Sequence, residues 1–271
     1  MVDNEGFMPE KQKNFVLPDN RFILLGASNL TLSLRLVIHL MQQQLGAPSE
    51  IVAAVGHGRA YGTPSRMLMR GLPSIADCGL WHRLAETESC PSYALLTDIG
   101  NDILYESPPE QLLRAVAWCI SRLQRQPVQI VATNLPLRSI ERLSEGRYLI
   151  FRNLFYPFCK LSLVETARRA RIVHEGLLDM AASMHFKLYE QDPVWFGLDG
   201  IHANYWQRKA YYRDMLAQFP VPDRISTSRQ QAHSLTWQQR PTVASKTVFG
   251  RTINCPQPSG RLSDGSPVAT Y

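Results

Sequence analysis

Hydrophobic positions along the chain alternate between short continuous runs and longer stretches with helical spacing. Three stretches in which apolar residues recur every three or four positions predict helices over Leu30–Leu45, Pro109–Leu123 and Val164–Met184. The short runs predict buried β-strands, and they are Arg21–Leu25, Ile51–Val55, Tyr93–Leu96, Val128–Thr133 and Phe186–Glu190. Strands that alternate with helices are typical of a parallel sheet whose right-handed crossovers place helices on both faces. The pattern therefore predicts an α/β domain with a central parallel sheet of about five strands.

Changes in composition divide the 271 residues into three parts. Residues 1–20 form an N-terminal extension, and residues 21–222 carry the alternating pattern of one α/β domain. An aromatic-rich insertion, about residues 135–163, interrupts this pattern between the fourth strand and the last helix. Residues 223–271 are rich in Ser, Gln, Thr and Pro, which predicts a largely flexible tail, with a terminal hairpin at Asp264-Gly265 as an alternative.

The positive charge of the chain gathers in this tail. The chain has a formal net charge of +6, and residues 223–271 contribute six Lys or Arg against two Asp. A basic tail favours weak contact with anionic surfaces, but it lacks the arginine–aromatic interleaving of nucleic-acid binders, so no specific nucleic-acid partner is expected. The polar N-terminus and the lack of any apolar run near the roughly 18 residues that span a bilayer predict a cytoplasmic protein.

Cysteine and histidine spacing gives no metal or disulfide signal. The five cysteines are widely spaced without a CxxC pair, and no HExxH occurs among the seven histidines. The pair Gly56 and Gly58 after the second strand superficially resembles a dinucleotide fingerprint, but the next glycine, Gly62, comes four positions later instead of three. We therefore expect no cofactor and no metal.

Four polar clusters follow predicted strands or lie in late loops, where a sheet of this kind binds its ligands. They are Gly26-Ala27-Ser28-Asn29, Gly56-His57-Gly58, Gly100-Asn101-Asp102 and Asp199-Gly200-Ile201-His202. Loops at the carboxyl ends of parallel strands converge on one edge of the sheet, so we expect the clusters to share a site. Together they hold a serine, amide donors and a histidine three residues after an aspartate, which are the groups needed to attack an acyl carbon and stabilise an oxyanion.

In this order, and over residues 21–220, the clusters resemble the signature elements of the SGNH (GDSL-like) hydrolases, a family of esterases, lipases and deacetylases. The resemblance implies a flavodoxin-like three-layer α/β/α fold and an acyl-serine mechanism. Ser28 corresponds to the nucleophile, His202 to the general base and Asp199 to its carboxylate partner. The backbone amides of Ser28 and Gly58 and the side chain of Asn101 correspond to the oxyanion donors, with Gly56 as the alternative to Gly58.

Two departures from the family pattern affect the expected activity. Ala27 stands where the family's Gly-Asp-Ser-Leu element has aspartate, and Asn29 separates the serine from Leu30, so we expect a slow enzyme. Ala203 replaces the proline that usually follows the family's histidine. An acyltransferase using the same site and a catalytically silent binding or scaffold protein remain alternatives to a hydrolase.

The substrate contacts are expected from one loop and from the insertion. His57 lies in the glycine-rich loop, and Phe151, Leu154 and Phe155 are the candidate wall for the acyl group of a small or lipid-like ester. The insertion can equally serve as a lid or as a dimer surface, so the sequence leaves the oligomeric state open.

Overall fold

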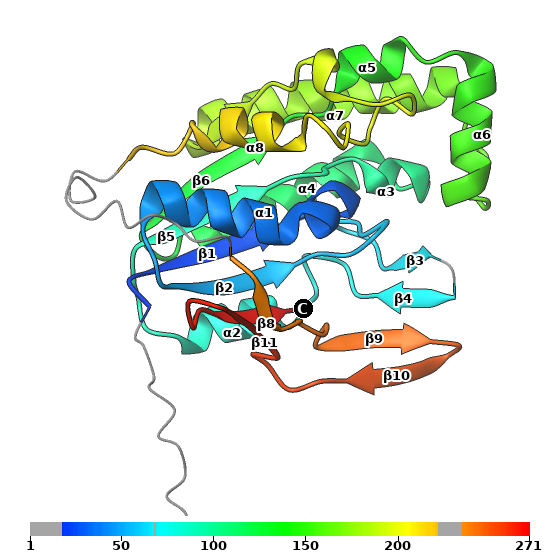
Figure 1. Cartoon of the computed structure of the whole chain (residues 1–271). Helices are drawn as coiled ribbons and strands as arrows, with labels where there is room; N and C mark the ends of the chain where they lie inside the picture. Colours follow the sequence, from blue (N-terminus) through cyan, green and yellow to red (C-terminus); the bar gives the residue numbers. More distant parts are fainter. Residues whose placement is uncertain (1–17, 68, 222–234) are drawn as a thin grey trace, which may run out of the picture.

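The five predicted strands form the parallel part of the central sheet. The computed structural model describes residues 18–67, 69–221 and 235–271, so most of the expected N-terminal extension lies outside the described residues. The parallel strands run in the order β7-β6-β5-β1-β2 (Figure 1). Their bounds are β1 Asn20–Leu25, β2 Ser49–Ala54, β5 Ser92–Leu96, β6 Val128–Thr133 and β7 Lys187–Tyr189. The predicted α/β fold with a mostly parallel sheet is confirmed.

The sheet continues beyond β2 with three strands from the C-terminal segment. Strand β12 (Pro267–Thr270) pairs parallel to β2, with Ala269 opposite Val52. Strands β11 (Gly260–Leu262) and β8 (Trp237–Gln239) follow in antiparallel fashion, which makes an eight-stranded sheet. The prediction of a largely flexible tail is therefore wrong for residues 235–271. The composition of the tail gave the wrong prediction because a segment with few apolar residues can still form strands when the edge of an existing sheet supplies the backbone hydrogen bonds.

Helices cover both faces of the sheet, and alternate strand residues point into two separate cores. On one face, Phe22 and Leu24 of β1 pack with α1 (Ser28–Leu45) and α8 (Arg208–Leu216). On the other face, Ile23 and Leu25 pack with α2 (Leu80–Glu86), α4 (Pro109–Leu123) and α7 (Leu163–Met184). All six residues of β1 are buried, as expected for a strand between two helical layers.

A second, four-stranded antiparallel sheet, here called sheet B, extends from the carboxyl edge of the main sheet (Figure 1). It combines a hairpin that follows the Gly56–Gly62 loop with a hairpin from the C-terminal segment, and its strand order is β10-β9-β4-β3. The bounds are β3 Ser65–Met67, β4 Arg70–Leu72, β9 Ser245–Val248 and β10 Arg251–Asn254. Two segments almost 180 residues apart in the sequence are thus joined beside the polar clusters.

The insertion folds as two short helices at the same end of the molecule. Helix α5 (Leu137–Glu141) and helix α6 (Glu145–Phe155) precede α7. Two further short helical elements lie outside the insertion, α3 (Asn101–Leu104) after β5 and η1 (Pro193–Trp195) after β7. Ser144 caps the N-terminus of α6, and its hydroxyl accepts a hydrogen bond from the amide of Arg147. It is fixed at Tyr148, whose hydroxyl contacts Thr166 Oγ1 at 2.7 Å and donates to the carbonyl of Leu161 at 2.8 Å. None of the helices in the described ranges is long and apolar enough to span a bilayer.

The incorporation of the C-terminal strands into the sheet predicts a stability contribution from Leu262. This side chain is fully buried in the α1–α8 core, so Leu262→Ala is expected to lower the free energy of unfolding by about 2–5 kcal/mol, as urea denaturation would measure. Ile253→Ala is the matched control, because it also truncates a branched apolar side chain but at a position in β10 that is about half exposed. Equal small effects of the two substitutions would contradict the placement of β11 in the sheet.

Candidate active site

Ser28, His202 and Asp199 form a hydrogen-bonded series at the carboxyl edge of the sheet. Ser28 is the first residue of α1, directly after the turn that ends β1, and its Oγ lies 2.8 Å from Nε2 of His202. Nδ1 of His202 contacts Oδ2 of Asp199. An ionised Asp199 accepts a hydrogen bond from the N–H at Nδ1, so the proton stays on Nδ1 and Nε2 is left as an acceptor for the Ser28 hydroxyl.

The loop that carries both Asp199 and His202 is held by its own backbone. Oδ1 of Asp199 accepts the amide of His202 at 3.0 Å and the amide of Ile201 at 3.2 Å. Gly200 has φ of +74°, a left-handed conformation that disfavours any side chain, and a Cβ there would lie 3.1 Å from the carbonyl oxygen of Ser139. The D-x-x-H spacing thus produces a tight turn in which one carboxylate orients both the loop and the imidazole.

The charge of Asp199 also sets the protonation of the pair. Burial disfavours the charged form of His202, but the hydrogen bond and charge of Asp199, with a smaller contribution from Asp98, outweigh it and raise the pKa of His202. Burial likewise opposes ionisation of Asp199, and the hydrogen bonds from His202 and from the loop amides prevail and lower its pKa. The arrangement favours a negative carboxylate beside an imidazole that readily accepts a proton.

Asp98 organises the turn that carries Ser28, a role that sequence reasoning missed. Its Oδ2 accepts the amide of Ala27 at 2.7 Å and that of Leu30 at 3.2 Å, while its Oδ1 accepts Nδ2 of Asn29 at 2.7 Å. Asp98 has φ of +57°, which is uncommon for a residue with a side chain. A carboxylate at the N-terminus of α1 therefore binds the turn from the neighbouring strand, although position 27 holds no aspartate.

Asn29 joins the turn that carries Ser28 to the loop that carries His202. Its Nδ2 donates to the carbonyl of Ile201 at 2.9 Å, and its Oδ1 accepts the amide of Ala203 at 2.9 Å. This residue, which departs from the family motif, thus contacts the backbone on both sides of His202. In the sequence, the roles of Asn29 and Asp98 were indicated only by an amide side chain next to Ser28 and an acid just before the Gly100-Asn101-Asp102 cluster.

The two candidate oxyanion elements are tied to each other. Asn101 begins α3 and donates from Nδ2 to the carbonyl of Arg59 at 2.8 Å, and the hydroxyl of Tyr105 donates to the carbonyl of Gly58 at 2.9 Å. Asp102 is fully buried and accepts the amides of Tyr61 and Gly62, each at 2.8 Å. Burial raises the pKa of Asp102. Helix α3 therefore fixes the glycine-rich loop that contains His57 and Gly58.

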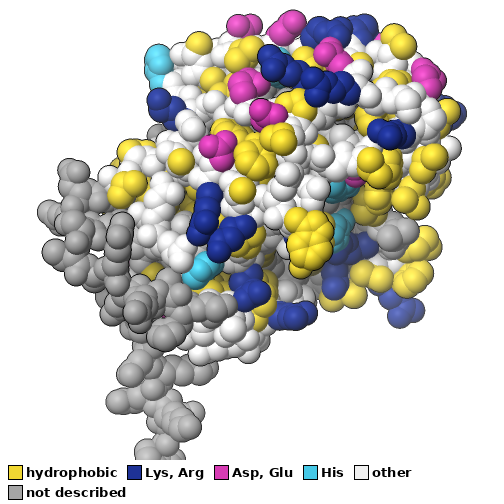
Figure 2. Space-filling view, turned by 45° about the horizontal axis from the view of Figure 1, so that its top comes forward, with side chains coloured by type: hydrophobic (Ala, Val, Ile, Leu, Met, Phe, Trp, Pro, Cys, Tyr) yellow, Lys and Arg dark blue, Asp and Glu magenta, His cyan; other side chains and the backbone are white. Residues whose placement is uncertain are grey.

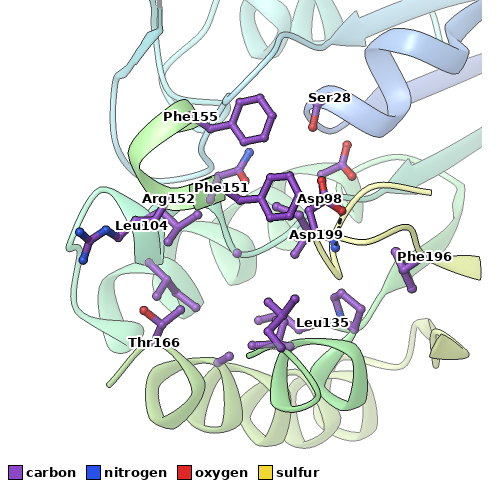
Figure 3. A pocket seen from close by; sticks show the side chains of 18 of the residues that line it. Ser28, Asp98, Leu104, Leu135, Phe151, Arg152, Phe155, Thr166, Phe196 and Asp199 are labelled. Carbon is purple, nitrogen blue, oxygen red and sulfur yellow. Dashed lines mark hydrogen bonds between the residues drawn. The ribbon is translucent and has the colours of Figure 1, made fainter. Parts of the chain in front are cut away.

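A pocket opens beside Ser28 and runs beneath the insertion (Figure 3). It encloses about 960 Å³ of empty space, part of it open to solvent, and its walls are mainly apolar. Residues Tyr148, Phe151, Arg152 and Phe155 of α6 line it, and their spacing is that of one face of a helix. The ring of Phe155 contacts that of His202 edge to face, with centroids 5.7 Å apart. Ser28, Asn101 and Asp199 line the same pocket.

The structure separates the predicted substrate contacts into two groups. Phe151 and Phe155 line the pocket, whereas Leu154 is 63% exposed, so its predicted place in the pocket wall is wrong. Helical rotation explains this, because position 154 falls on the outer side when 151 and 155 face inward. His57 and Gly58 lie on the loop behind Asn101 and are not part of the pocket lining. In the described part of the chain, no group of three or more His, Cys, Asp or Glu side chains is placed to bind a metal ion.

Comparison with known proteins gives matches in structure only. No family model matches the sequence, and no curated protein matches it. The fold is similar to that of Est24, a carbohydrate acetylesterase from Sinorhizobium meliloti, with a TM-score of 0.52 and 10% sequence identity over 73% of this chain and 97% of that chain. It is also similar to the inhibitor-bound aryl esterase of M. smegmatis, with a TM-score of 0.50 and 16% identity over 73% and 97% of the two chains. The structural neighbours are esterases of the SGNH/GDSL family, and the chain shares their α/β fold.

Proposed function

We propose that the protein hydrolyses a carboxylic ester through an acyl-serine intermediate on Ser28. The observation that carries this proposal is the contact of 2.8 Å between Ser28 Oγ and His202 Nε2, with Asp199 on the other imidazole nitrogen, at the mouth of an apolar pocket. A hydroxyl, a base and an orienting carboxylate in this order are the groups of an activated serine nucleophile.

The reaction uses these groups in two half-reactions. Ser28 Oγ attacks the ester carbonyl while its proton moves to His202 Nε2, and the resulting oxyanion accepts hydrogen bonds from the amide of Ser28, from Asn101 Nδ2 and from the amide of Gly58. The tetrahedral species then collapses, and the alcohol leaves with the proton from His202. Water attacks the acyl-serine with His202 again taking the proton, which releases the carboxylic acid and restores Ser28.

The pocket favours an ester with an apolar acyl group larger than acetyl. Its mainly apolar lining begins at Ser28 and continues along the inner face of α6. An acyl chain that enters beneath α6 is removed from water along its length, and each buried methylene contributes about 0.8 kcal/mol.

The nucleophile is tested by covalent labelling. A fluorophosphonate probe is expected to label the wild-type chain on Ser28, and Ser28→Ala is expected to abolish both labelling and ester hydrolysis because no other hydroxyl contacts His202 among the described residues. Ser33→Ala, in the same helix but buried in the core, is the matched control and is expected to keep both activities. Undiminished labelling of Ser28→Ala would contradict the proposal.

The protonation of His202 predicts the pH dependence of acylation. Only neutral His202 accepts the Ser28 proton, so the labelling rate is expected to fall as pH decreases through the pKa of His202, which lies above the ordinary value of 6.5. Asp199→Asn removes the carboxylate that contributes most to raising this pKa, so the midpoint is expected to move to lower pH. The same change lowers the plateau rate by up to about 10⁴-fold. A labelling rate that is independent of pH from 5 to 9 would exclude His202 as the base.

The acyl pocket is tested with esters of graded chain length. Phe151→Ala is expected to lower kcat/KM for octanoyl esters by about 10-fold or more relative to acetyl esters, because a long chain loses an apolar wall that an acetyl group does not reach. Leu154→Ala removes an apolar side chain from the outer side of the same helix and is expected to leave the octanoyl-to-acetyl ratio unchanged. An equal effect of the two substitutions would point to a general role of α6 in stability.

A further inference from the structure

One face of sheet B contacts the loop that carries His57 and Gly58. Residues directly opposite each other on neighbouring strands project to the same side. By this register, Met67 pairs with Arg70, Arg70 with Val248, and Val248 with Arg251. A Cβ placed on Gly58 would lie 2.8 Å from the methyl carbon of Met67, so this face of the sheet rests against the glycine-rich loop.

Arg70 lies at the loop, within electrostatic reach of His57. Its guanidinium nitrogen is 3.7 Å from the position that a Cβ on Gly56 would occupy. Burial lowers the pKa of His57, and the positive charges of Arg70 and His202 lower it further. His57 therefore lies within electrostatic reach of both Arg70 and His202. Arg70 is not among the residues that line the acyl pocket.

The same face continues outward with two more cations. Arg251 is directly opposite Val248, and Lys246 lies two residues before Val248 on the same strand. Both side chains therefore project to the same side of sheet B as Arg70 and extend its basic surface. The strands of sheet B contain no acidic residue, and in the ranges that the structure describes none of the three cations forms an ion pair. In Figure 2 the acidic side chains lie in the upper half of the view, while Lys and Arg without acidic neighbours lie in the lower half.

The size and position of this surface limit its ligand. Adjacent strands are about 4.8 Å apart, so the distance from β4 to β10 is roughly 10 Å, which suits a single anionic group with its substituents. Helix α6 and sheet B extend from the same edge of the main sheet, with α6 at the top and sheet B at the bottom of the view in Figure 1. Ser28 and Asn101 follow strands β1 and β5, which lie in the middle of the sheet between them. An ester with its carbonyl at Ser28 and its acyl chain beneath α6 would therefore direct its alcohol part toward sheet B.

We propose that Arg70, Lys246 and Arg251 form a subsite for the alcohol part of the substrate, and that this part carries an anionic group such as a phosphate, sulfonate or carboxylate. The proposal rests on the proposed ester hydrolysis and names its substrate class, an amphiphilic ester with an apolar acyl chain and an anionic alcohol. A cation that lacks an acidic partner and borders a catalytic site gains by binding an anion because no ion pair has to be broken first.

Two matched esters test the subsite. The 4-(octanoyloxy)benzenesulfonate ion carries the charge, and 4-(octanoyloxy)benzenesulfonamide is neutral with a similar shape and leaving group. The ratio of kcat/KM for the sulfonate to that for the sulfonamide is expected to fall about fivefold in Arg70→Gln at low salt, the effect of one partly exposed ion pair. Lys246→Gln and Arg251→Gln are expected to lower the ratio by smaller factors, and added salt is expected to reduce the ratio in the wild-type protein.

Arg125→Gln is the matched control. Arg125 follows the end of α4, next to the start of β6 at the opposite edge of the sheet, and its substitution removes the same unit of charge. An unchanged ratio in Arg70→Gln, or an equal fall in Arg125→Gln, would overturn the subsite. Both outcomes leave the proposed function standing as long as hydrolysis of the neutral ester requires Ser28. Loss of that requirement would instead overturn the ester-hydrolase proposal itself.

Discussion

The geometry of the site depends on the carboxylate of Asp98. Its two oxygens accept three hydrogen bonds from the Ala27–Leu30 turn, and Asn29 in turn binds the backbone on both sides of His202. A contact of 2.8 Å between Ser28 and His202 joins segments 174 residues apart. Such a contact persists only if both backbones are fixed, because a displacement of about 1 Å is enough to lower the rate of a positioned reaction strongly. The Asp98–Asn29 pair supplies that restraint.

The second restraint comes from the C-terminal segment. Its last strand, β12, lies beside β2, and the guanidinium of buried Arg59 donates to the main-chain oxygen of Tyr271 and to that of Val55 at 3.3 Å. The carbonyl of the same Arg59 accepts the hydrogen bond from Asn101. Burial lowers the pKa of this arginine. The glycine-rich loop is therefore held from one side by α3 and from the other by the end of the chain.

The insertion and sheet B give this fold two surfaces of opposite character near Ser28. Helix α6 presents aromatic rings to an apolar pocket, and the sheet B face presents cations without acidic neighbours among the described residues. The cations are not part of the pocket lining, so under the proposed function a substrate that extends beyond the pocket to sheet B meets an apolar wall at one end and positive charge at the other. This asymmetry is the basis for expecting an amphiphilic ester.

The sequence by itself determined the parallel sheet, its helices and the residues Ser28, Asp199 and His202, because these follow from local periodicity and from motifs of a few residues. It also identified Phe151 and Phe155, but it assigned Leu154 to the wrong side because their placement depends on how α6 rotates over the pocket. Asp98 and the cations Arg70, Lys246 and Arg251 gained their roles only from the pairing of strands distant in sequence. The hairpin at Asp264-Gly265 was offered as an alternative from its turn and is present as β11 and β12, but its place in the sheet and the other C-terminal strands were missed for the same reason. Their segment lacks the apolar content to fold alone, and only the open edge of β2 gives its backbone the hydrogen bonds that make it a sheet.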